Sequence, residues 1–154
     1  MTTQYVFIKS SACSISNNMY KINLGIESNR PPTQIIEVIS ILLEGINYHP
    51  YISVRGDFQA ANGFTNDGYP NCLTILQYNQ EQSAGHNIYN IVSLSDQPKY
   101  TLSYSKSFNI YFENDSGNTI SSANILSFVM LIKIISPVQE QITKDYRKEI
   151  PLQA

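Results

Sequence analysis

The feature that most constrains the fold is an alternation of apolar and polar side chains in short runs. Residues 107–113 carry apolar side chains at every second position, and residues 19–24 repeat the pattern. Successive side chains of a β-strand point to opposite faces, so such a run forms a strand with one buried face. An amphipathic helix would instead need apolar residues three and four positions apart. The sequence therefore predicts an all-β fold.

Turn residues divide the alternating segments into about eight strands. Pro31-Pro32 interrupts any ladder, and Asn62-Gly63 and Asp67-Gly68 are turn dipeptides. The expected strands are residues 4–9, 19–24, 35–48, 51–54, 72–78, 88–94, 107–113 and 124–135. Short strands at this spacing, without a long helix among them or an internal repeat, predict an antiparallel eight-stranded β-sandwich or barrel.

Three segments are less regular. The apolar positions of residues 35–48 also fit a helix, although their Ile and Val content favours a strand with a bulge near Gly45. Residues 79–87 are expected to form a loop. Residues 124–135 are apolar on both faces, which predicts a strand in the middle of a sheet.

The segment that follows Pro137 has a different pattern. Apolar side chains recur there every four residues with charged and polar residues between them, as in an amphipathic helix. We therefore divide the chain into a β-domain, residues 1–136, and an amphipathic tail, residues 137–154. The tail either folds back on its own domain, docks on a neighbouring subunit, or stays disordered. Its candidate partner-contact residues are Val138, Ile142, Tyr146 and Ile150.

Charge and hydropathy argue against two classes of partner. Charged residues make up 14% of the chain, the net charge is −2 and no basic cluster is present, so no nucleic-acid partner is expected. The most apolar run, residues 125–135, is too short to span a bilayer and contains Lys133. The first residues lack the apolar run of a signal peptide, which favours a cytoplasmic origin. A polar surface with little charge suits packing against neighbouring proteins.

The residues that could carry chemistry are dispersed. His49 and His86 fall in different expected loops without a metal ligand at suitable spacing. Ser83 lies near His86, but neighbours in sequence rarely form a catalytic pair. The candidate carboxylates are scattered over Glu44, Asp57, Glu81 and Asp96. We therefore expect no catalytic, metal or cofactor site, and no enzyme.

Two further features would matter in an extracellular protein. Cys13 and Cys72 lie far apart, and we expect both to be reduced or buried, although one disulfide remains open. Arg55-Gly56-Asp57 matches the integrin-binding triplet, but a three-residue match arises often by chance. Neither feature makes an extracellular role the leading interpretation.

The order of features also resembles a known family. An early strand, Asn18–Leu24, precedes Pro31-Pro32 and a long strand that closes at Tyr48-His49-Pro50. Leu102-Ser103, the alternating Phe108–Phe112, the turn Asp115-Ser116-Gly117 and a final apolar strand follow. Over about Gln4 to Ser136 this order resembles the small single jelly-roll minor capsid and penton proteins of large DNA viruses, virophages and related elements.

The resemblance implies an antiparallel eight-stranded jelly-roll β-sandwich that assembles rather than catalyses. Such a protein is a structural component of the virion, made in the host cytoplasm, and its partners are other capsid subunits. It implies a homo-oligomer, a pentamer or a trimer, without deciding between penton and another minor capsid role. No catalytic residues are carried over.

The alternative function is a carbohydrate- or receptor-binding β-sandwich, such as a lectin or a fibre head. It would bind glycans through loop side chains near Tyr69 and Asn71. A cupin-like enzyme is a third class, but cupins need clustered His and Glu ligands that the sequence lacks.

Overall fold

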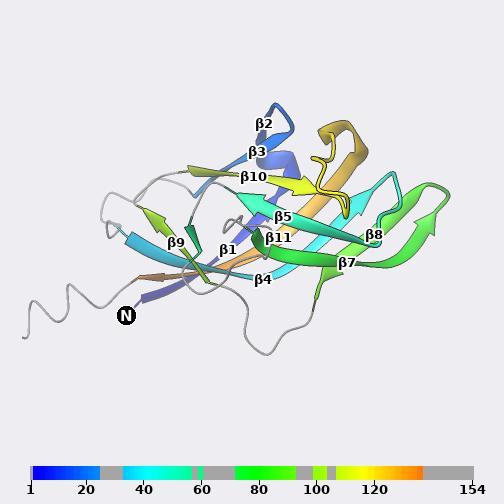
Figure 1. Ribbon diagram of the computed structural model, residues 1–154. Coiled ribbons are helices and arrows are strands. Elements are labelled where there is room, and N and C mark those ends of the chain that lie inside the picture. The colour runs from blue at the N-terminus through cyan, green and yellow to red at the C-terminus, as the bar shows by residue number, and fades with distance from the viewer. Residues whose placement is uncertain are drawn as a thin grey trace, which may run out of the picture.

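The described part of the protein is one curled antiparallel sheet (Figure 1). The computed structural model describes residues 2–24, 33–56, 59–60, 72–92, 99–103 and 107–136. Within them the helical elements are two single 3₁₀ turns, η1 (Ser10–Ala12) and η2 (Ser122–Asn124). The prediction of an all-β fold is confirmed.

Among the described residues there are eleven strands, where the sequence suggested about eight. Three short strands, β2, β6 and β9, were not expected. The strands are β1 (Thr2–Lys9), β2 (Ser14–Ser16), β3 (Met19–Asn23), β4 (Thr33–Gly45), β5 (Tyr51–Gly56), β6 (Gln59–Ala60), β7 (Cys72–Ser83), β8 (His86–Ile91), β9 (Lys99–Ser103), β10 (Ser107–Glu113) and β11 (Ile125–Ser136).

The strands pair in the order β1-β11-β4-β8-β7-β5-β10-β3-β2. β4 has two partners along one edge, because its first half pairs with β9 and its last residues pair with β8. Its other edge pairs with β11 over most of its length. β11 thus lies between β1 and β4, so it is paired on both edges, but it is next to the edge strand β1 rather than in the middle of the sheet where its apolar sequence was expected to place it.

The ambiguous run 35–48 is a strand up to Gly45. The pairing of β4 with β11 shifts register at two positions. One falls where Ile125 and Ser127 pair with Gly45 and Glu44, which leaves Leu126 of β11 as an extra residue. The other falls where Leu131 and Ile132 pair with Ser40 and Val38. The bulge expected near Gly45 is present in the pairing, but the additional residue belongs to β11.

The prediction of a loop at residues 79–87 is wrong. β7 continues to Ser83 and β8 begins at His86, so the two strands form a hairpin whose turn is Ala84-Gly85. Gly85 has φ +77°, a conformation that glycine adopts without strain. Beyond Tyr78 the side chains of β7 are polar and exposed on both faces, so this part of the strand lacks the apolar alternation that identifies a strand.

The core lies inside the curl, between the part of the sheet that holds β3 and β10 and the part that holds β11 (Figure 1). Three rings meet there edge to face. The Tyr20 centroid lies 5.6 Å from that of Phe112 and 5.1 Å from that of Phe128, and the two phenylalanines are 5.3 Å apart. Such contacts add to the burial energy of aromatic rings. The curl is therefore closed by aromatic packing of β11 against the paired strands β3 and β10, with which β11 does not pair.

Candidate functional site

An apolar surface covers the outer side of β1, β11 and β4. Phe7 is 71% exposed, Tyr5 59%, Leu42 54% and Val129 43%. The register joins them, because Phe7 pairs with Leu131, and Val129 pairs with both Lys9 and Leu42. Among the described residues no element covers these side chains. We call this surface the outer face; its members are Tyr5, Phe7, Ile35, Leu42, Val129, Leu131 and Ile135.

The outer face exists because β11 is apolar at consecutive positions. Phe128, Met130, Ile132 and Ile134 are buried in the core. The residues between them point to the opposite side, where Val129 remains exposed. The sequence identified β11 as apolar on both sides. It could not show that, among the described residues, no element packs on the second side. An exposed apolar area on a protein of this size is a typical feature of an interaction site.

Charged groups lie within and beside this surface. The register places Lys133 between Tyr5 on β1 and Glu37 on β4. At the β8 side His86 Nδ1 lies 2.9 Å from Glu44 Oε1. Both side chains of this pair are partly exposed, so water screens the contact. The outer face is therefore mixed, because Lys133 lies on β11 between the apolar members Leu131 and Ile135.

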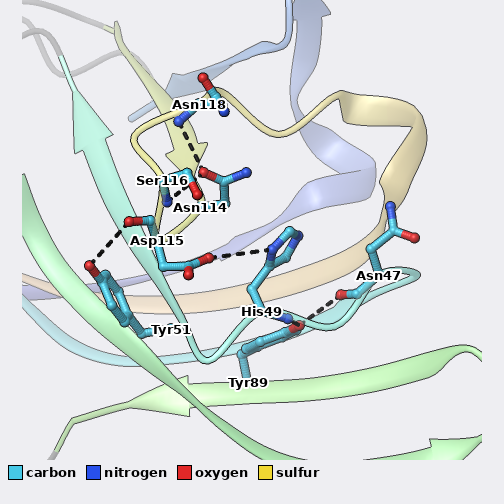
Figure 2. A network of polar contacts seen from close by, with 8 residues as sticks. All are labelled: Asn47, His49, Tyr51, Tyr89, Asn114, Asp115, Ser116 and Asn118. Carbon is cyan, nitrogen blue, oxygen red and sulfur yellow. Dashed lines mark hydrogen bonds and ion pairs between the residues drawn. The ribbon is translucent and has the colours of Figure 1, made fainter.

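A second set of polar contacts joins the connection between β4 and β5 to the core (Figure 2). The Tyr89 hydroxyl donates to the carbonyl oxygen of Asn47 and accepts from the backbone N–H of His49, both at 2.8 Å. Burial raises the pKa of Tyr89, and the His49 hydrogen bond opposes that shift. Tyr89 keeps its proton and acts as a fixed anchor for the connection.

The turn after β10 lies against the same connection (Figure 2). Asn114 Oδ1 accepts from the backbone N–H groups of Ser116 and Asn118, both at 3.0 Å. The Tyr51 hydroxyl donates to the Asp115 carbonyl oxygen at 3.5 Å, and His49 Nδ1 lies 3.9 Å from Asp115 Oδ1. Most of these groups bond to backbone atoms, so the arrangement stabilises two loops and presents no free nucleophile.

The structure separates the other residues that the sequence analysis considered. Ser83 and His86 pair across the β7–β8 hairpin, but His86 contacts Glu44 rather than Ser83. Glu81 Oε1 accepts from the backbone of Gly85. Asp57 and Asp96 lie outside the described residues, as do Tyr69 and Asn71 of the glycan-binding alternative. Within the described ranges, no three His, Cys, Asp or Glu side chains are placed to hold a metal ion.

The integrin-type triplet is not available as a surface motif. Arg55 and Gly56 are both buried in β5. The Arg55 side chain is 7% exposed, and its Nε lies 3.0 Å from Glu113 Oε1 on β10. A buried guanidinium held in this way cannot reach a receptor. Arg55 is a structural residue.

Both cysteines are free thiols and partly buried. Cys13 packs against the core, and its thiol donates to the Lys9 carbonyl oxygen at 3.5 Å. Burial raises the pKa of Cys13, which keeps the thiol protonated and unreactive. Cys72 belongs to β7, and its thiol donates to the Thr74 carbonyl oxygen at 3.6 Å.

A pocket of about 390 Å³ opens between η1, β2 and the start of β11. Ile15 and Leu126 form exposed parts of its wall, and Tyr20 contributes to its lining. Tyr20 is 2% exposed, and its hydroxyl is buried with no hydrogen-bond partner among the residues that the structure describes. A buried hydroxyl in this state is a cost to the fold.

We expect Tyr20→Phe to raise the free energy of unfolding by about 1 kcal/mol at pH 7, because the variant removes an unsatisfied polar group and keeps the ring. Burial, with a smaller effect from Cys13, raises the pKa of Tyr20 from 10.0 to about 12. The folded protein thus holds this proton more tightly than the unfolded chain does. Below pH 10 the Tyr20 hydroxyl is protonated in both the folded and the unfolded state, so the difference in pKa contributes fully to the free energy of unfolding. As the pH rises towards about 12, the unfolded chain releases this proton first, and the free energy of unfolding of the parent falls.

Urea unfolding at pH 7 and pH 11 measures both effects. Tyr20→Phe should lose less stability than the parent between these pH values. The matched control is Tyr48→Phe, whose side chain is exposed, and it should stay within about 0.5 kcal/mol of the parent at pH 7. A loss of more than 1 kcal/mol for Tyr20→Phe at pH 7 would mean that the hydroxyl has a stabilising partner.

The predicted contact residues Val138, Ile142, Tyr146 and Ile150 lie outside the described residues. In the part of the chain that the structure describes, no helix is long and apolar enough to cross a membrane. No protein-family model matches the sequence, and no curated protein matches it either. The outer face, which sequence reasoning missed, is thus the feature that the structure adds to the functional argument.

Proposed function

We propose that the protein is a structural component of a virion, a minor capsid or penton protein that self-assembles and docks to neighbouring capsid proteins. The order in which its strands pair is the observation that carries this proposal. Its fold would be an antiparallel jelly roll, and its partners would be further copies and other capsid subunits.

Eight of the strands pair in a nested order along the chain. β1 pairs with β11, β3 with β10, β4 with β9 and β5 with β7. The first of these eight strands pairs with the eighth, the second with the seventh, the third with the sixth and the fourth with the fifth. This is the pairing of one long antiparallel ribbon that is folded at its middle. Rolling that ribbon brings its third strand against its eighth and its fourth against its seventh. The pairs β4–β11 and β5–β10 meet this condition.

A rolled antiparallel ribbon of eight strands is the jelly roll, which viral capsid and lectin domains use. β8 is an addition to that scheme, since it pairs with β7 on one side and β4 on the other. It links the two halves of the roll into one continuous sheet. The short strands β2 and β6 are edge additions that leave the nested order unchanged.

The outer face favours assembly over glycan binding. Lectin sites bind polar sugars through loop side chains, whereas this surface presents Phe7, Leu42 and Val129 on regular strands. Apolar side chains on rigid strands suit a protein surface of matching shape. The anchored loops of Figure 2 supply a stable end to the domain, as packing against fixed neighbours requires.

The test is the molar mass of the full chain in solution, measured by light scattering over a range of concentrations. The proposal predicts a closed oligomer, a trimer or a pentamer of the 17.4 kDa chain. A mass of one chain at every concentration would contradict self-assembly.

A further inference from the structure

We infer that the outer face of one copy binds the amphipathic tail, residues 137–154, of a second copy. This inference rests on the proposed function, because it names the contact through which the copies assemble. It joins an apolar surface that is exposed among the described strands with an apolar stripe in the sequence that follows them.

The two features match in length. The outer face extends along β11 from Ile135 to Val129, seven residues whose six steps span about 20 Å at the rise of a β-strand. The stripe extends from Val138 to Ile150, thirteen residues whose twelve steps span about 18 Å in an α-helix. Four side chains spaced at i, i+4 would lie on one side of that helix. One helix could therefore cover the surface from end to end.

The two features also match in chemistry. The centre of the outer face offers Phe7, Leu131 and Val129 across neighbouring strands. The stripe offers aliphatic and aromatic side chains, and the tail carries equal numbers of acidic and basic residues between them. Lys133 and Glu37 give the surface both signs of charge as well. Contact between the two would bury apolar area without bringing a net charge against a like charge.

The start of the tail favours a second copy over the same copy. β11 ends at Ser136, and Pro137 alone separates it from Val138, the first member of the stripe. The residue before a proline is biased to an extended conformation, so a tail that kept the direction of Ser136 would continue outward along β11. From Ser136 to Val138 it can advance about 7 Å. A layer packed on the outer face would have its axis about 10 Å above the sheet.

To cover its own outer face, a tail would have to reverse direction directly after Pro137, whereas a tail that continued outward would reach a neighbour without that reversal. If the tail instead continues outward, all four stripe residues can reach the outer face of a neighbour. When each copy reaches the next in this way, the contact is heterologous, and it forms a ring where the rotation between neighbouring copies closes. A ring of this kind agrees with the trimer or pentamer expected above.

The experiment uses full-length variants and light scattering. Leu42→Ser changes the outer face, and its control is Ile75→Ser, because Ile75 is 40% exposed on β7, a strand that pairs with none of β1, β11 and β4. Ile142→Ser changes the stripe, and its control is Gln141→Ser at the next position. We expect Leu42→Ser and Ile142→Ser each to weaken association at least tenfold, and both controls to assemble as the parent does.

Mixing the two weakened variants identifies the source of the tail. A copy with Leu42→Ser keeps its tail, and a copy with Ile142→Ser keeps its outer face, so an exchanged contact forms between them. Native mass spectrometry with one partner labelled with ¹⁵N should therefore detect mixed pairs that neither variant forms alone. A tail that binds its own domain would give no mixed pairs, and that result would overturn the inference.

The outcomes separate the inference from the proposed function. If the parent assembles and Ile142→Ser assembles equally well, the tail is not the bound segment, and the inference fails while self-assembly stands. If the parent is a monomer at every concentration, self-assembly fails, and the inference fails with it. Circular dichroism of each variant confirms that the β-domain is folded, so that a loss of association is not a loss of structure.

Discussion

Phe128→Ala is expected to lower the free energy of unfolding by about 4 kcal/mol, because it empties the centre of the core. The Phe128 ring is 1% exposed and packs edge to face with Tyr20 and Phe112. These three rings come from β11, β3 and β10, which do not all pair with one another. Without the middle ring, the two sides of the curl lose their direct contact as well as buried area.

Chemical denaturation of the full chain measures this loss. The matched control is Ile75→Ala on β7, where an aliphatic side chain of a strand is 40% exposed, and it should cost less than about 1.5 kcal/mol. A cost for Phe128→Ala below that of Ile75→Ala would contradict the position of the core. Retained cooperativity, seen as an unchanged denaturant slope, would show that the fold survives the cavity.

Glu113→Ala is expected to cost about 3 kcal/mol, because it removes the carboxylate that faces a buried guanidinium. Arg55 Nε lies 3.0 Å from Glu113 Oε1, and the two side chains are 7% and 20% exposed. A charge that has left water depends on its partner far more than an exposed charge does. The contact also joins β5 to β10, so its loss weakens a central pair of strands.

Glu44→Ala is the control for this prediction, since it removes a carboxylate from the more exposed contact with His86. It should cost less than about 1 kcal/mol. Arg55→Met combined with Glu113→Ala should be less destabilising than the sum of the two single variants, because the double variant leaves no buried charge. Equal costs for Glu113→Ala and Glu44→Ala would contradict the burial of Arg55.

The strands that alternate cleanly were predictable, and those that do not were missed. Residues 107–113 and 19–23 form strands as expected, because one face of each is buried and the pattern records it. The ladder at residues 79–83 has exposed polar side chains on both faces, so the pattern carries no signal. Strand pairing alone holds it, and pairing is not visible in a single sequence.

The candidate site was less predictable than the fold. The sequence indicated that β11 is apolar on both sides, yet burial depends on what covers each side. Val129 and Phe128 are neighbours in sequence, and one is exposed while the other is in the core. Arg55 shows the reverse case, because the first residue of a motif typical of exposed loops is buried in β5, where Glu113 contacts it. Both outcomes depend on tertiary contacts between distant segments.

The molar mass of the full chain, at concentrations from about 1 μM to 100 μM, tests self-assembly most directly. Self-assembly into a closed trimer or pentamer predicts a mass that reaches three or five times 17.4 kDa and then stays constant, since a closed ring has no free contact left. A constant mass of 17.4 kDa over the whole range would contradict it, and the outer face would then need a partner other than this chain.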